Sequence, residues 1–235
     1  MKKRNSVFYH KPYRWIALFS IIIILGFLPS YAVSFYQLSN THHWHGGLSL
    51  LWLILLTLQP LLIEKGSRKL HRILGWFGAG LALLLVVSTS ILFIDTVQKN
   101  AAKGGVFQMV YWVDIFLLPL FIVLVTIGLV KRKQPDQHKR FMFLSVLVLL
   151  PPGLGRLIYT SFLFPFDLPM RYFYEPMMFI LLIVLWFVGR EEQWRYWQTQ
   201  LVFSVVLLAT VSAYFIVDSD WFMNIASALA SWSKS

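Results

Sequence analysis

Residues 107–130 read FQMVYWVDIFLLPLFIVLVTIGLV, and residues 131–140 read KRKQPDQHKR. The first stretch exceeds the roughly 20 residues that a helix needs to cross about 30 Å of hydrocarbon. The second stretch carries five Lys and Arg residues. A long apolar run followed directly by a basic loop is typical of a membrane-spanning helix that ends on the cytoplasmic side.

Six more apolar stretches of similar length occur along the chain, which is 58% hydrophobic and only 13% charged. Soluble domains average about 25% charged residues, so this chain is too apolar to fold in water. The sequence therefore predicts an all-α bundle of seven transmembrane helices in a single membrane domain, residues 1–235. The predicted spans are Trp15–Phe35, Trp44–Ile63, Ile73–Ile94, Phe107–Val130, Phe141–Phe164, Tyr172–Gly189 and Leu201–Val217.

The net charge of +11 is divided by side of the membrane. Sixteen of the 21 Lys and Arg residues fall in residues 1–14, 64–72, 131–140 and 190–199, which alternate spans place on one side. The positive-inside rule makes that side cytoplasmic, so the N-terminus is predicted inside and the C-terminus outside. Charge in this pattern indicates contact with anionic lipid and not with nucleic acid. The predicted location is a bacterial inner membrane, which the chain crosses several times.

Two segments outside the predicted spans have their own character. Residues 1–14 form a basic cytoplasmic leader, and we expect the first span to be retained because its apolar run continues past Pro29. Residues 220–233 predict a short amphipathic helix that lies flat on the outer membrane surface. The apolar face of that helix is formed by Trp221, Ile225, Leu229 and Trp232. The chain has no cysteine, which excludes disulfides, thiolate metal sites and thioether-linked haem.

Two histidines lie at the cytoplasmic mouths of predicted spans. His71 begins the motif HRILG before the third span, and His138 begins HKRFM before the fifth. Neutral imidazoles ligate haem iron, and the basic residues beside both histidines disfavour protonation of the rings. We therefore predict a b-type haem between His71 and His138, with Gln59 and Arg140 in the same layer. The other interpretation is that these are ordinary basic loops in contact with phospholipid head groups.

Three further histidines, His42, His43 and His45, lie at the start of the second span. Clusters of imidazoles suit copper, zinc or iron, so they are a candidate metal site. They are equally typical of a proton-sensitive rim or of a loop without function. His45 is also a third candidate haem ligand, because Gly46 and Gly47 behind it allow a flat cofactor to approach closely.

The fifth span contains the sequence PPGLGR at residues 151–156. Two prolines remove backbone donors and two glycines allow an irregular backbone, so we predict a break in the helix near the membrane midplane. Such a break either lines a ligand cavity or is a simple proline kink. Arg156 follows the break at a depth similar to that of Asp114. These two form either a structural ion pair or, with Tyr159 and Glu175, the polar lining of a cavity.

The segment from His45 through Gln59-Pro60, the motifs HRILG and HKRFM, and Arg156 resemble a group of uncharacterised bacterial predicted membrane proteins. Those proteins are in turn distantly similar to b-type cytochromes and to ferric-reductase-like transmembrane proteins. The resemblance covers about half of the chain. It implies a helical bundle that binds haem b, without naming a reaction.

The leading functional hypothesis is a membrane redox protein that binds b-type haem and passes electrons between a membrane quinone and an acceptor. The alternative is a small transporter or ligand-sensing protein with a cavity at the broken fifth span, and the third is a scaffold or assembly factor. The sequence leaves open whether the chain is an enzyme. Membrane lipids are expected partners, a redox partner or homo-oligomer is left open, and no nucleic acid is expected.

Overall fold

The computed structural model describes residues 7–100, 106–166, 172, 174–216 and 219–232. Regular structure in these ranges is helical throughout, which confirms the predicted all-α class. The α-helices are α1 (Val7–His10), α2 (Pro12–Ser34), α3 (Asn40–Glu64), α4 (Arg68–Asn100), α5 (Val106–Val130), α6 (Pro135–Val148), α7 (Leu150–Ile158), α8 (Tyr174–Glu191), α9 (Trp197–Ile216) and α10 (Asp220–Trp232). Short 3-10 or π turns occur at Phe35–Gln37, Lys131–Lys133, Tyr159–Leu163 and Phe164–Phe166.

Six helical segments in the described part of the chain are long and apolar enough to cross a membrane. They correspond to six of the seven predicted spans. Helix α8 lies at the position of the remaining one, but its 18 residues include three charges, at Glu175, Arg190 and Glu191, which set it apart from the six. The six segments are Pro12–Gln37, Asn40–Glu64, Arg68–Asn100, Gln108–Lys133, Pro135–Phe162 and Trp197–Ile216.

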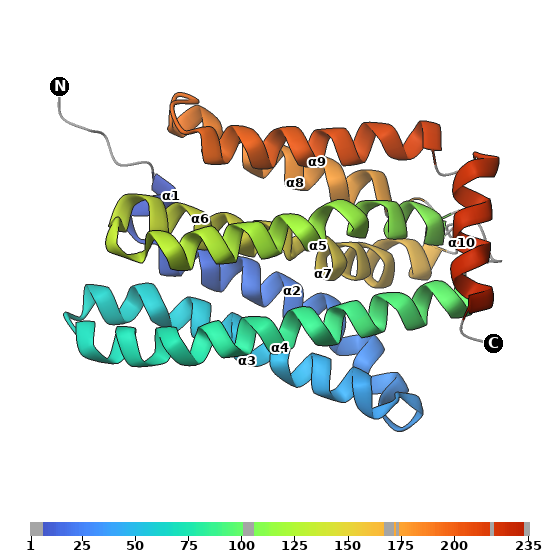
Figure 1. Cartoon of the computed structure of the whole chain (residues 1–235), viewed down its shortest axis with the longest axis horizontal. Coiled ribbons are helices and arrows are strands. Elements are labelled where there is room, and N and C mark those ends of the chain that lie inside the picture. Colours follow the sequence, from blue (N-terminus) through green and yellow to red (C-terminus); the bar gives the residue numbers. More distant parts are fainter. Residues whose placement is uncertain (1–6, 101–105, 167–171, 173, 217–218, 233–235) are drawn as a thin grey trace.

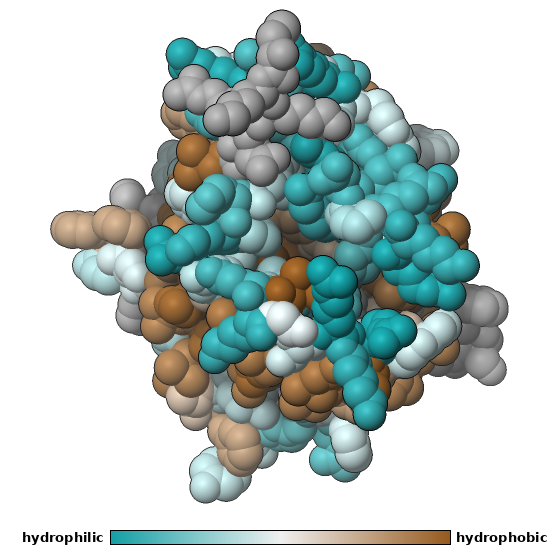
Figure 2. Space-filling model, turned by 90° about the vertical axis from the view of Figure 1, so that its left-hand side faces the viewer, coloured by the Kyte–Doolittle hydropathy of each residue, from teal (hydrophilic) through white to brown (hydrophobic). Residues whose placement is uncertain are grey.

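The long helices run side by side, and α10 lies across one end of the bundle (Figure 1). The α3–α4, α5–α6 and α8–α9 turns lie together with α1 at the opposite end. Figure 2 looks onto that end and shows hydrophilic side chains gathered there. We call it the basic end, because its exposed residues include Arg14, Lys65, Arg68, Lys133 and Arg195.

The core of the bundle is centred on α6. In the segment Pro135–Phe162, 72% of the residues in its apolar 18-residue stretch are buried. The corresponding share in the other five segments is 39% or less. Phe141, Phe143 and Leu144 are fully buried. A helix that is apolar on all sides needs neighbours on all sides, and α6 contacts α5, α2, α9 and α3. Side chains on α6 are therefore positioned by several other helices.

The predicted break in the fifth span lies at Leu149, directly before the PPGLGR motif. The irregular backbone expected within the motif itself is wrong, because residues 151–156 lie inside helix α7. Helix α6 ends at Val148 and α7 begins at Leu150, so Leu149 alone separates them. Pro151 and Pro152 lie in the first turn of α7, where a missing backbone N–H costs little. The two helices belong to one apolar segment, Pro135–Phe162, so the break is a local interruption within one crossing.

The predicted C-terminal helix is also present, as α10. Its N-cap is Ser219, whose hydroxyl accepts a hydrogen bond of 3.3 Å from the backbone N–H of Phe222. Phe222 is buried against Trp112 of α5, with ring centroids 5.5 Å apart. Helix α10 therefore packs on the bundle through the face that carries Phe222.

The apolar face that the sequence predicted for this helix points elsewhere. Trp221 and Ile225 are 61% and 39% exposed, and the side chains of Leu229 and Trp232 lie outside the described part. Helix α10 therefore has two apolar sides, one packed on the bundle and one exposed, and the placement of the exposed side against the membrane surface stays a prediction.

Candidate functional site

The basic end brings His71 and His138 together. Each is the fourth residue of its helix, α4 and α6 respectively, and both are partly buried. Their ring centroids are 6.2 Å apart and their planes are inclined at 86°. With metal–nitrogen bonds of about 2.0–2.1 Å, imidazoles on opposite sides of one metal ion would have centroids about 6 Å apart. The spacing is that of an edge-to-face contact between two rings, and it also matches the separation of two ligands of one metal ion.

A backbone carbonyl orients the His138 ring. Its Nδ1 donates to the carbonyl oxygen of Gly128, at the end of α5, over 2.7 Å. A carbonyl only accepts, so Nδ1 carries the proton and the lone pair remains on Nε2. Metal-ligating histidines are commonly held in this way by the nitrogen that does not bind the metal.

Gln59 holds the His71 ring from α3. The Nδ1 atom of His71 lies 3.3 Å from the carbonyl oxygen of Gln59, and the side-chain amide of Gln59 lies against the same nitrogen when its NH₂ group faces the ring. The carbonyl favours a proton on Nδ1, whereas an amide NH₂ favours a lone pair there. The orientation of the Gln59 amide therefore sets the tautomer of His71. The predicted grouping of Gln59 with the two histidines is present in the structure.

Arg140 was predicted beside these histidines but lies on the other side of α6. Two positions along a helix correspond to a rotation of about 200°, so Arg140 faces away from His138. Its guanidinium forms an ion pair with Glu192, directly after α8. The same guanidinium lies over the ring of Tyr196, at 3.2 Å from the centroid, and near the ring of Tyr9, at 4.6 Å.

The Arg140–Glu192 pair is enclosed. Arg140 is 7% exposed and Glu192 is 5% exposed, and Thr199 donates a hydrogen bond of 2.6 Å to the second carboxylate oxygen. Burial raises the pKa of the Tyr9 phenol above its usual value, so this ring stays neutral beside the cation. Sequence reasoning missed Glu192, because it resembles the other polar residues of a loop. The signal available was a pair of carboxylates, Glu191 and Glu192, followed by three aromatic residues at the end of an apolar helix.

Part of the predicted cytoplasmic leader belongs to this end of the bundle. Phe8 and Tyr9 of α1 are 9% and 6% exposed, and both rings pack against Phe143 of α6. Phe8 also contacts Trp15, with ring centroids 4.8 Å apart. The leader was predicted from its basic residues, whereas its aromatic residues Phe8 and Tyr9 pack into the core.

The three histidines at the start of α3 do not converge. Each uses Nδ1 to contact a different hydroxyl, and within the described ranges no three His, Cys, Asp or Glu side chains are grouped so as to hold a metal ion. The predicted three-histidine metal site therefore does not form in this structure. The contacts are His42 with Ser39 at 2.8 Å, His43 with Tyr31 at 2.7 Å and His45 with Ser88 at 3.1 Å.

His45 is also remote from the histidines at the basic end. At 1.5 Å per residue, it lies about 21 Å along α3 from Gln59, which contacts His71. One metal ion cannot bind His45 together with His71 and His138. His45 could serve only a second, separate cofactor.

Asp114 and Arg156 lie within electrostatic reach of one another, on α5 and α7. Both residues are described, but they form no ion pair within 4.0 Å. The Arg156 guanidinium instead lies 4.6 Å from the centroid of the Phe27 ring on α2. Glu175 interacts with Tyr214 of α9, and Tyr159 begins the π turn after α7. Asp114, Arg156, Tyr159 and Glu175 are thus described with different neighbours and not as the lining of one shared cavity.

The glycine-rich side of the helix break is closed by α2. A Cβ atom on Gly153 would lie 2.6 Å from the Cα atom of Ile23, and one on Gly26 would collide with the carbonyl oxygen of Gly153. The two backbones are therefore in contact. A ligand cavity was one interpretation of the break, and on this side a helix crossing occupies the space.

No protein-family model, curated protein or solved structure matches this chain.

Proposed function

We propose that the protein is a multi-pass membrane redox protein that holds one b-type haem between His71 and His138. In this proposal it passes electrons between a membrane quinone and an acceptor at one face. The observation that carries the proposal is the 6.2 Å separation of the two imidazole centroids, together with the carbonyl that leaves Nε2 of His138 free. Two side chains 67 positions apart in the sequence meet at the spacing expected of a shared metal.

The chain's own residues have separate parts in this proposal. Gly128 holds the His138 ring through its carbonyl, and Gln59 orients His71. The exposed guanidinium of Arg72 is next to His71 in sequence, and it would pair with a haem propionate. The ammonium of Lys139, next to His138, already pairs with Asp136 at 2.7 Å. The bound haem would supply a reversible one-electron iron couple.

The proposal includes seven crossings, with α8 as the additional one. Its 18 residues would extend about 27 Å as a helix, close to the hydrocarbon thickness. Its charges lie at its two ends, with Glu175 in the first turn and Arg190 and Glu191 in the last. Charges at both ends support a helix that crosses between two head-group layers. With α8 included, the basic end faces the cytoplasm of a bacterial cell and α10 lies on the outer surface.

Absorption spectroscopy of the purified protein tests the haem proposal. We expect a Soret band that shifts on reduction with dithionite and that is lost in His71→Ala and in His138→Ala. His42→Ala is the matched control, since this histidine lies at the other end of the bundle and should leave the spectrum unchanged. Size-exclusion profiles of the variants establish that they fold. A colourless preparation from haem-supplied cells, or a Soret band that survives both substitutions, would overturn the proposal.

A further inference from the structure

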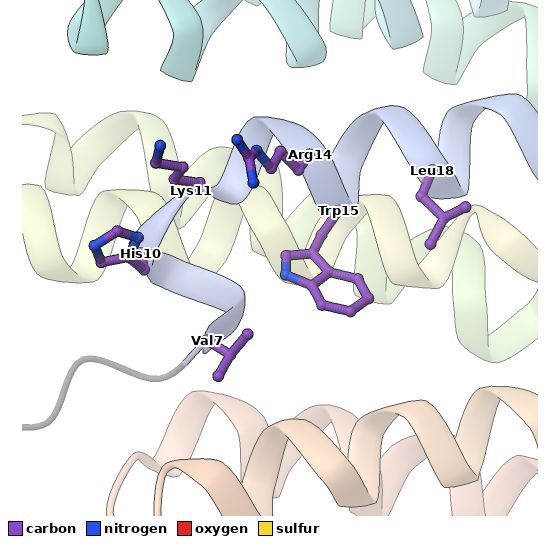
Figure 3. Close-up of a pocket in the computed structure, with 6 residues that line it drawn as sticks. All are labelled: Val7, His10, Lys11, Arg14, Trp15 and Leu18. Atoms are coloured by element: carbon purple, nitrogen blue, oxygen red, sulfur yellow. The ribbon is translucent and has the colours of Figure 1, made fainter.

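A groove at the beginning of α2 combines positive charge with an apolar wall (Figure 3). Its volume is about 590 Å³, and it lies at the basic end of the bundle. Figure 3 shows side chains of α1 and of the first two turns of α2 around it. The lining residues are Val7, His10, Lys11, Arg14, Trp15 and Leu18.

The positive charge in this groove is only partly neutralised by the protein. Lys11 and Arg14 are both in the lining, and α2 has no acidic residue in its first turn. Glu64 Oε1 lies 3.9 Å from Lys11 Nζ, with both side chains about 40% exposed, which makes this a weak pair. Arg14 is exposed and makes its described contact with the Tyr13 ring, 5.9 Å from the centroid. An anion is therefore the complementary occupant for this part of the groove.

The rest of the groove is apolar and continues into the membrane-spanning part of α2. Trp15 is held in place by Phe8 and Phe19, with centroids at 4.8 Å and 6.4 Å. Leu18, one turn further along the segment Pro12–Gln37, is 45% exposed. Tryptophan is characteristic of the membrane–water interface, with lysine and arginine just beyond it. The apolar wall therefore extends from the head-group region toward the hydrocarbon.

We propose that this groove is a binding site for one anionic phospholipid. The lipid phosphate binds Lys11 and Arg14, and an acyl chain lies along Trp15 and Leu18. A free anion would not contact the apolar wall. A zwitterionic phospholipid has the same phosphate, but its quaternary ammonium offsets the negative charge beside Lys11 and Arg14, so an anionic phospholipid fits the groove better. The site is independent of the histidine pair, because it lies on α1 and α2 and includes neither residue.

Native mass spectrometry of the detergent-purified protein tests this proposal, with dioleoyl phosphatidylglycerol and dioleoyl phosphatidylcholine as probes. We expect phosphatidylglycerol to be retained preferentially. In the double variant Lys11→Gln/Arg14→Gln, the concentration of phosphatidylglycerol at half occupancy should rise about twentyfold, since each basic residue near an anionic lipid contributes several-fold. Leu18→Gln should also weaken binding without changing the charge.

The matched control is Arg68→Gln/Lys69→Gln, which removes the same two charges from exposed positions at the same end of the bundle. It should leave phosphatidylglycerol retention unchanged. Equal losses in the two double variants, or equal retention of both lipids by the wild type, would overturn the site. Displacement of phosphatidylglycerol by millimolar inorganic phosphate, with Leu18→Gln unaffected, would also overturn it, because the groove would then bind a free anion.

Discussion

At the level of single residues, the buried ion pair between Arg140 and Glu192 connects several segments at the basic end. Removing two charges from water is costly, and here three contacts offset that cost: the pair itself, the hydrogen bond from Thr199 and the aromatic rings above the guanidinium. The pair joins α6 to the loop after α8, and Tyr9 brings α1 onto it. Three segments distant in sequence therefore depend on one guanidinium.

Glu192→Ala should be strongly destabilising, because it leaves the Arg140 charge buried without a partner. We expect the free energy of unfolding to fall by about 3–5 kcal/mol, measured by denaturant unfolding in detergent. Glu191→Ala, at the exposed neighbouring position, should change it by less than about 0.5 kcal/mol. Arg140→Met combined with Glu192→Leu should recover most of the loss. If Glu192→Ala were as stable as Glu191→Ala, the Arg140–Glu192 pair would have no role in stabilising the bundle.

At the level of elements, the crossing of α2 and α7 is a direct contact between two helix backbones. Gly26 and Gly153 let the two backbones touch, in a region where small residues allow close packing in lipid. The break at Leu149 lies four residues before Gly153, at the end of α6. Within the PPGLGR motif, Pro151 and Pro152 therefore lie in the first turn of α7, and Gly153 lets α7 pack directly on α2.

Gly153→Ala should separate α2 from α7, since the added methyl group would lie 2.6 Å from the Cα atom of Ile23. We expect a loss of about 1–3 kcal/mol in the free energy of unfolding, the usual cost of overpacking. Gly80→Ala is the control, because a Cβ atom at that position on α4 meets nothing within 4 Å. It should be neutral or slightly stabilising. A Gly153→Ala protein as stable as the Gly80→Ala protein would contradict the close crossing.

At the level of the whole molecule, α1 and α10 lie at opposite ends of the bundle (Figure 1). Among the described residues, most of the exposed basic side chains lie at the α1 end, so this end favours anionic lipid more strongly than the other. Helix α8 lies between α7 and α9 and contacts both. Whether it crosses the bilayer decides on which side the α8–α9 turn lies.

Fusions of bacterial alkaline phosphatase, which is active only outside the cytoplasm, test the topology. A fusion after Gln193, in the α8–α9 turn, should be inactive, and a fusion after Ser235 should be active. A fluorescent protein fused before Met1 should be fluorescent, as expected in the cytoplasm. Activity of the Gln193 fusion would show that α8 does not cross, and the count of seven crossings would then be wrong.

Several features of the fold and the site followed from the sequence. The long apolar runs predicted the helices, and the motifs HRILG and HKRFM marked the two histidines that meet. The PPGLGR motif indicated an interruption nearby, which lies at Leu149, although the motif itself is helical. These features depend on a residue and its near neighbours, through helical length, missing backbone donors and the position of a turn. The three-histidine cluster was wrong as a group, because proximity along the chain does not make side chains converge.

Other features required the packed bundle. His138 and Arg140 are two positions apart, yet one faces His71 and the other faces Glu192, because α6 is surrounded by helices and its rotation decides which neighbour each side chain meets. The burial of Tyr9 and the contact of Gly26 with Gly153 likewise join residues more than 100 positions apart. Hydropathy and charge belong to each residue wherever it lies, so they can be read along the chain. Contacts between helices depend on how each helix is rotated, and that is decided only when all of them pack together.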